Sequence, residues 1–132
     1  MNIAVFADIH GRILLCFKLC ERWERETGEH ISFILQAGDL GVYPHLSHLD
    51  RATIKHTRND PSELGFANDF ATYQADVAAT LSQTSFPMIF VRGNHEDHEW
   101  LDEREQQIDE PLFPVDAYNR IFCLKTGMPY DL

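Results

Sequence analysis

Three short apolar runs in the chain are each followed by glycine and by polar residues that commonly bind metals. The three motifs are Asp8-Ile9-His10-Gly11 after residues 4–7, Gly38-Asp39 after residues 33–35, and Gly93-Asn94-His95-Glu96 after residues 88–91. Parallel strands of an α/β sheet place their carboxyl ends along one edge, where ligands bind. Aspartate, histidine and asparagine donors gathered there suit a divalent cation. The sequence therefore predicts an α/β fold with a metal site at one edge of its sheet.

The first part of the chain has the pattern of a βαβ unit. Ile3–Ala7 and Ile31–Leu35 are continuous apolar runs of the kind found in buried parallel strands. Between them, residues 12–27 repeat apolar residues at helical spacing, and Gly28 is placed to end that helix. We expect the two strands to be parallel and their crossover to be right-handed.

The segment between the second and third runs contains no convincing strand. Two helices are expected, over residues 47–58 and over residues 68–83 with Asn68 as N-cap, separated by a break at Asn59-Asp60-Pro61. We interpret residues 44–86 as a helical insertion. Because the insertion leaves from the edge that carries the ligands, it is well placed to shape substrate choice.

The rest of the chain continues the α/β pattern. Met88–Val91 is expected to form the third strand and Ile121–Leu124 a fourth, with a polar helix starting near His98 between them. Asp97 and Glu99 fit the start of that helix, where acidic side chains complement the helix dipole. No linker divides the chain, so residues 1–132 are expected to form a single domain.

Composition limits the classes of function. The net charge of −10 argues against binding of duplex nucleic acid through a basic surface, but bound cations would still allow a phosphate substrate. No run is apolar enough for a membrane span. We expect no signal peptide, because Met1-Asn2 leads straight into the first predicted strand. The three cysteines, Cys16, Cys20 and Cys123, do not suggest a disulfide framework. A cytoplasmic protein is the expectation.

The spacing of the polar residues suggests how they could share cations. Asp8 and His10 lie two residues apart at a strand end, and Asp39 can offer both of its carboxylate oxygens. Asn94 offers an amide oxygen, and the imidazole of His95 could act on a bound phosphate ester. Any one of these residues alone is more often structural. Their conjunction, in order and each after an apolar run, favours a metal site.

These motifs resemble those of the calcineurin-like metallophosphoesterases. The residues that match the family's first three motifs, D-x-H, G-D and G-N-H-E, are Asp8, His10, Gly38, Asp39, Gly93, Asn94, His95 and Glu96. The resemblance implies the first half of a β-sandwich with flanking helices and mainly parallel central strands. It also implies that Asp8 and His10 bind a first metal, Asp39 bridges both metals and Asn94 binds the second. His95 would contact the phosphate and assist the leaving group.

The function implied by this resemblance is hydrolysis of phosphate mono- or diesters through a dinuclear metal centre and a bridging hydroxide. Asp39 and His95 would be the catalytic residues. The cofactors would be two divalent ions, which the ligands allow to be Mn, Fe or Zn. The partner would be a phosphate-ester substrate.

The family's later histidine motif, G-H-x-H, does not occur in this chain. We therefore expect a truncated form of the fold, in which the second cation has only Asp39 and Asn94. The alternative is a non-catalytic binding or scaffold module with an incomplete metal site, completed or covered by a second copy or another chain. A dinucleotide-binding domain is excluded because no G-x-G-x-x-G follows the first strand.

Several weaker signals surround these motifs. His45, His48 and His56 could form a cap over the site, but surface histidines are the more common explanation. Tyr43 could line the pocket, although a purely structural position is favoured. Arg92 precedes Gly93 by one position, which favours a side chain that points away from the site.

Overall fold

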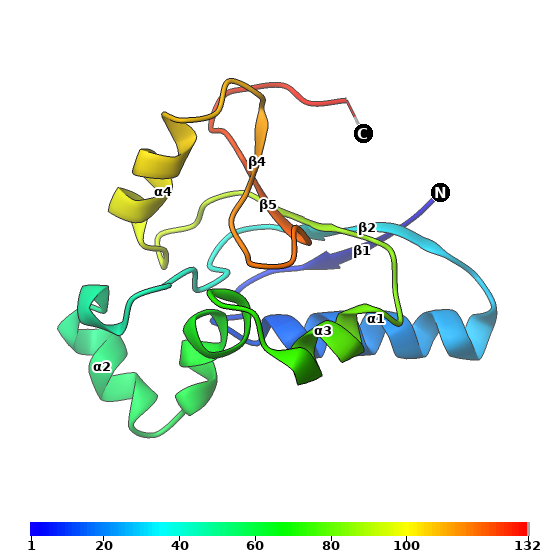
Figure 1. The fold of residues 1–132 in the computed structure, drawn as a ribbon, viewed down its shortest axis with the longest axis horizontal. Coiled ribbons are helices and arrows are strands. Elements are labelled where there is room, and N and C mark those ends of the chain that lie inside the picture. The colour runs from blue at the N-terminus through cyan, green and yellow to red at the C-terminus, as the bar shows by residue number, and fades with distance from the viewer. Residues whose placement is uncertain (132) are drawn as a thin grey trace.

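The computed structural model describes residues 1–131 and contains a five-stranded sheet (Figure 1). Along the sheet the strands are β1 (Asn2–Phe6), β2 (Ile31–Gln36), β3 (Met88–Phe90), β5 (Ile121–Leu124) and β4 (Leu112–Pro114). The first four in this order are parallel, and only β4 runs antiparallel to its neighbour β5. The predicted α/β class, with mainly parallel central strands and flanking helices, is confirmed.

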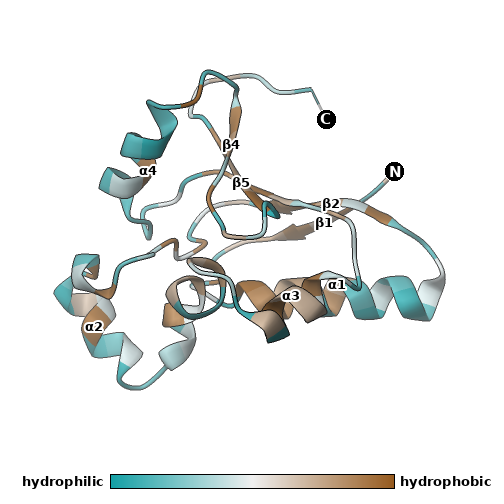
Figure 2. Cartoon of the chain, in the orientation of Figure 1, coloured by the Kyte–Doolittle hydropathy of each residue, from teal (hydrophilic) through white to brown (hydrophobic). Residues whose placement is uncertain are grey.

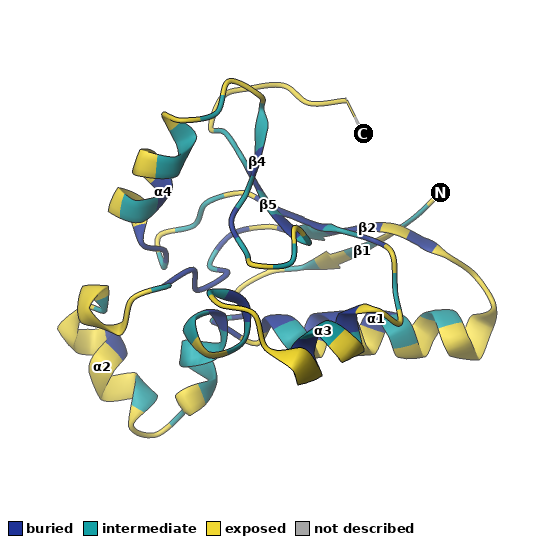
Figure 3. Cartoon of the chain, viewed as in Figure 1, coloured by how far each residue is buried: buried dark blue, intermediate teal, exposed yellow. Residues whose placement is uncertain are grey.

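Helix α1 (Ile13–Thr27) covers one face of this sheet together with α3 (Ala75–Leu81) (Figure 1). Gly28 ends α1 as predicted, with a left-handed φ of 74° and a hydrogen bond from its N–H to the Glu24 carbonyl. The apolar face of α1 is buried against the sheet (Figures 2 and 3). At the centre of this face, the ring centroid of Phe17 lies 6.2 Å from the ring centroid of Phe70 and 5.9 Å from that of Phe86.

The prediction of two long helices between β2 and β3 is wrong, because this segment consists of five short helical pieces. They are a 3-10 turn at Leu46–His48, α2 (Arg51–Thr57), a 3-10 turn at Pro61–Leu64, a π-helical turn at Phe66–Phe70, and α3. We refer to the whole as the helical segment 46–81.

Local capping explains the break at residue 50. Asp50 has an extended backbone and accepts a hydrogen bond from the Thr53 N–H at 2.7 Å, so a new helix starts there rather than at residue 47. Asn68 lies inside the π-helical turn and is not an N-cap. Gln74 is extended and Tyr73 is 67% exposed, so the helix predicted over residues 68–83 is interrupted before α3.

Helix α4 (His98–Glu105) starts where the sequence predicted, with the Asp97 carboxylate accepting from the Trp100 N–H at 3.2 Å. Strand β4 was not predicted; it has three residues, one of them proline, and gives little periodic signal. Among the described residues the three cysteines form no disulfide. Within residues 1–131 no helix has the length and apolar character needed to cross a bilayer.

Candidate metal centre

Backbone hydrogen bonds join the turn after β1 to the turn after β2. The Asp8 N–H donates to the Gly38 carbonyl at 3.1 Å, the His10 N–H to the Asp39 carbonyl at 3.1 Å, and the Gly11 N–H to Leu40 at 2.8 Å. The two turns therefore extend the parallel pairing of β1 and β2 beyond the strand ends. This places the first two predicted motifs side by side at the carboxyl edge of the sheet.

Three residues in these turns have the left-handed backbone conformation that side-chain-bearing residues rarely adopt. The φ angles are 51° at Asp8, 44° at His10 and 55° at Asp39. Among the described residues, the only other non-glycine residue with a positive φ is Asn119. Such a conformation costs on the order of 1–3 kcal/mol per residue and is typical of functional sites. Three of the residues predicted as metal ligands thus carry most of this strain.

The side chains of these three residues converge. One possible ligand atom from each of Asp8, His10 and Asp39 lies within 4.8 Å of the other two. The Nδ1 atom of His10 is buried and has no hydrogen-bond partner among the described residues. Two carboxylates and an imidazole are donors that fit Mn, Fe or Zn. The donor set and the unpaired nitrogen therefore fit a divalent cation.

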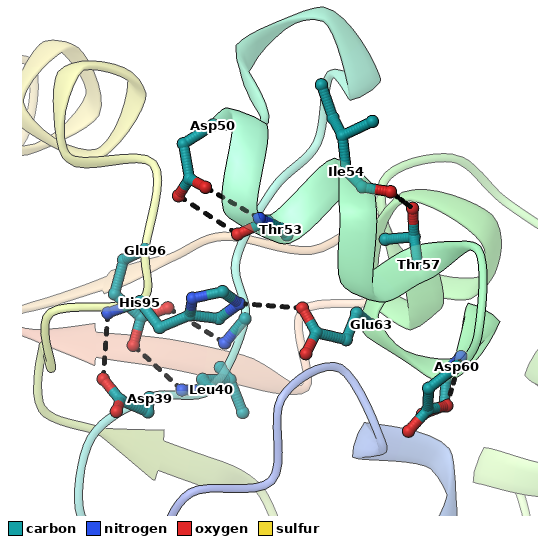
Figure 4. Close-up of polar contacts among 12 residues, drawn as sticks. Asp39, Leu40, Asp50, Thr53, Ile54, Thr57, Asp60, Glu63, His95 and Glu96 are labelled. Carbon is teal, nitrogen blue, oxygen red and sulfur yellow. Dashed lines mark hydrogen bonds and ion pairs between the residues drawn. The ribbon is translucent and has the colours of Figure 1, made fainter.

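The turn after β3 packs directly against Asp39. A Cβ atom at Gly93 would lie 2.1 Å from Asp39 Oδ1, so only glycine leaves room for this carboxylate. The His95 N–H donates to the same oxygen at 2.9 Å (Figure 4). The Asn94 amide also faces Asp39: with its nitrogen toward the carboxylate it donates to both oxygens, at 3.1 and 3.2 Å. With its oxygen turned there instead, two acceptors would face each other, as ligands of a shared cation do.

Glu96 organises the turn that carries Asp39. Its buried carboxylate accepts hydrogen bonds from the N–H groups of Leu40 at 2.9 Å, Gly41 at 3.1 Å and Val42 at 2.9 Å. Burial raises the pKa of Glu96, while these N–H groups act in the opposite direction. The sequence pointed to Glu96 as part of the third motif but gave no sign of this role.

The ring of His95 is bounded on three sides. Its centroid lies 4.6 Å from that of His10 and 5.1 Å from that of Tyr43, which is buried. Burial, followed by nearby carboxylates, raises the pKa of Tyr43 to about 12. On the third side, His95 Nε2 lies 3.1 Å from a carboxylate oxygen of Glu63 (Figure 4). Glu63 comes from the helical segment 46–81, and no motif marked it.

The remaining candidates have other contacts. His48 pairs with Asp97, at 2.8 Å, and its side chain is about half exposed. His56 is exposed and helps to line a cleft of about 390 Å³ that also reaches His10, Glu63 and His95. His45 is exposed on the surface beside His48.

Arg92 does point away from the site, as expected. Its guanidinium donates to Asp102 at 2.6 Å and to Glu105 at 2.5 Å, both on α4. It therefore ties the strand end to that helix rather than reaching the candidate metal ligands.

Comparison with known proteins identifies the family to which the chain belongs. The family model for calcineurin-like phosphoesterases matches residues 1–129. A search of curated proteins gives no match. The match covers nearly the whole chain, which therefore belongs to the calcineurin-like phosphoesterase family. Members of this family are generally hydrolases that use divalent metals.

Proposed function

We propose that the protein is a metal-dependent phosphoesterase that hydrolyses phosphate mono- or diesters. The observation that carries this proposal is the convergence of Asp8, His10 and Asp39, each with a left-handed backbone, within 4.8 Å. Strain of this kind persists only where the surrounding structure enforces it, and here the hydrogen bonds between the two turns do so. Family membership adds the class of reaction.

The proposed roles of the ligands follow from their positions. Asp8, His10 and Asp39 would hold a first divalent ion, and Asp39 with Asn94 a second. These ions, Mn, Fe or Zn, would activate water and neutralise charge on the phosphoryl oxygens. The Gly93 and His95 backbone keeps the Asp39 carboxylate in place for this task.

His95 would act on the phosphate ester itself. Its ring borders the cleft of about 390 Å³ and lies beside His10, so a phosphate held by the cations would be within its reach. From there an imidazole N–H can donate to the leaving oxygen. The chain's charge of −10 supports a substrate other than duplex nucleic acid.

A second candidate function is a binding module whose sheet edge is covered by another chain. The observation that favours it is β1, an edge strand in which Val5 is 64% and Ile3 is 40% exposed. Such an edge can pair with a further strand. This candidate predicts self-association or partner binding without metal-dependent turnover.

Measurements of metal binding and of hydrolysis on one set of variants would distinguish the phosphoesterase from the binding module. We would titrate Mn²⁺ calorimetrically and assay aryl phosphate mono- and diesters with wild type, Asp39→Asn and His95→Ala, using the exposed Asp109→Asn as control. Asp39→Asn should lose both metal and turnover. His95→Ala should keep the metal and lose on the order of 10²-fold or more in rate. Metal-dependent hydrolysis that survives Asp39→Asn would contradict the proposal, and a wild type that binds Mn²⁺ without turnover would favour the binding module.

A further inference from the structure

The turn that carries Glu63 is packed against the metal-binding turn by direct backbone contact. A Cβ atom at Gly11 would lie 2.4 Å from the Ser62 carbonyl oxygen, and one at Gly65 would lie 1.9 Å from the Gly11 carbonyl oxygen. Both positions therefore require glycine. As a result, the 3-10 turn Pro61–Leu64 sits directly over the residue that follows His10.

Side chains also join the same two segments. Arg12 forms an ion pair with Asp60, and Asp60 accepts a hydrogen bond from the Ser62 N–H at 3.1 Å, which caps the 3-10 turn. The ion pair is about half exposed, so its contribution is small. Its geometric effect is to fix the start of the turn, and thereby the direction in which Glu63 leaves it.

The Glu63 carboxylate reaches the ring of His95 from this turn. Its Oε2 atom lies 3.1 Å from His95 Nε2, and the two side chains are only 15% and 17% exposed. Partial burial strengthens such a contact relative to one in water. His10 and Tyr43 bound the ring on other sides, so few alternative orientations are open to it.

We propose that Glu63 is a positioning residue that fixes the orientation and the tautomer of His95. The carboxylate accepts a hydrogen bond from Nε2–H and so favours a ring that carries its hydrogen there. Nδ1 is then the ring nitrogen left for the phosphate ester, and it can donate to the leaving oxygen when it carries the second proton of an imidazolium ring, with Nε2–H still bound to Glu63. The catalytic consequence rests on the proposed function, whereas the pairing itself does not. The helical segment 46–81 thus contributes to the active site through a residue outside the family motifs.

The pairing can be tested by nitrogen-15 NMR of the histidine rings in the full chain without metal. Glu63→Ala, Glu63→Gln and the exposed Glu103→Ala would be compared with wild type, and His95→Ala would assign the signals. His95 should be protonated at Nε2 in wild type and in Glu103→Ala. The same holds for Glu63→Gln, because the glutamine amide oxygen can still accept the hydrogen bond. Glu63→Ala should show both tautomers. An unchanged His95 pattern in Glu63→Ala would overturn the proposal.

Kinetics and metal content test the consequence. With Mn²⁺ present, Glu63→Ala should lower kcat by about 10- to 100-fold, as is common for partners of site residues. KM and the number of bound Mn²⁺ ions should stay at wild-type values, and Glu63→Gln should recover part of the rate. Parallel loss of Mn²⁺ would make Glu63 a ligand and overturn the positioning role, as would a change in KM alone. An inactive wild type would refute the phosphoesterase function, while the NMR result would still decide the pairing.

Discussion

Replacement of Gly93 by alanine tests how strictly the position of Asp39 is determined. The added Cβ would lie 2.1 Å from Asp39 Oδ1 and 2.3 Å from its backbone nitrogen. Ordinary contact starts near 3.4 Å, so the carboxylate and residue 93 must separate by about 1.3 Å. That displacement also disturbs the hydrogen bond from the His95 N–H, now 2.9 Å.

The expected effect has two parts. Overpacking and the weakened hydrogen bond to a carboxylate should together lower the free energy of unfolding by about 2–4 kcal/mol. Metal–ligand distances tolerate only about 0.2 Å of deviation, so displacement of Asp39 should also weaken Mn²⁺ binding by more than about 10-fold. Urea denaturation measures the first effect, and calorimetric titration of Mn²⁺ the second.

Gly127→Ala is the matched control. Gly127 has a φ of 77°, and a Cβ there would meet nothing within 4 Å. Its replacement should cost about 1–2 kcal/mol of stability through backbone strain and leave Mn²⁺ binding unchanged. If Gly93→Ala bound Mn²⁺ as tightly as Gly127→Ala, Asp39 would not need its observed position, and the assignment of Asp39 as the shared ligand would fail.

Two further predictions concern the core. Phe17→Ala should lower the free energy of unfolding by about 3–5 kcal/mol in urea denaturation, because Phe17 is fully buried between α1 and the sheet; a loss below about 1 kcal/mol would contradict this packing. Burial raises the pKa of Cys16 and Cys123 to about 12 and that of Cys20 to about 11, so native thiols should resist a thiol reagent at pH 8 and react only on unfolding. The folded state keeps these thiols protonated to a higher pH than the unfolded state does. The thiols therefore do not reduce the free energy of unfolding below pH 9, and they lower it as the pH rises toward 12. Urea midpoints at increasing pH should therefore fall, and constant midpoints would argue against deep burial.

The parallel strands could be predicted because each is a continuous apolar run with a short polar motif at its end. Periodicity also gave α1 almost to the residue, and the acidic residues Asp97 and Glu99 indicated the start of α4. The helical segment 46–81 could not be predicted in detail because its breaks depend on a local cap at Asp50 and on the extended backbone of Gln74. Asp50 restarts the helix through its own side chain, and the extended Gln74 delays α3. An apolar stripe at helical spacing does not reveal such interruptions.

The gathering of the candidate side chains could be predicted for residues that directly follow strands, but not for Glu63, which comes from the helical segment. Asp8, His10 and Asp39 meet because β1 and β2 are parallel neighbours in the sheet. Glu63 reaches His95 only because the Gly11 and Gly65 backbones are in contact, and nothing near Glu63 in the sequence signals this. Tertiary contact, rather than local pattern, places that carboxylate.

The balance of strain and support at the sheet edge favours a metal site over a purely structural arrangement of these residues. The left-handed conformations of Asp8, His10 and Asp39 together cost several kcal/mol, on the order of 1–3 kcal/mol for each residue. The three hydrogen bonds that Glu96 accepts, and those between the two turns, offset this cost. A turn with a purely structural role would gain nothing by directing two carboxylates and an imidazole at one point, because like charges repel there when no cation is bound. A divalent cation bound between these turns would explain the arrangement, with His95 and its partner Glu63 facing the cleft beside it.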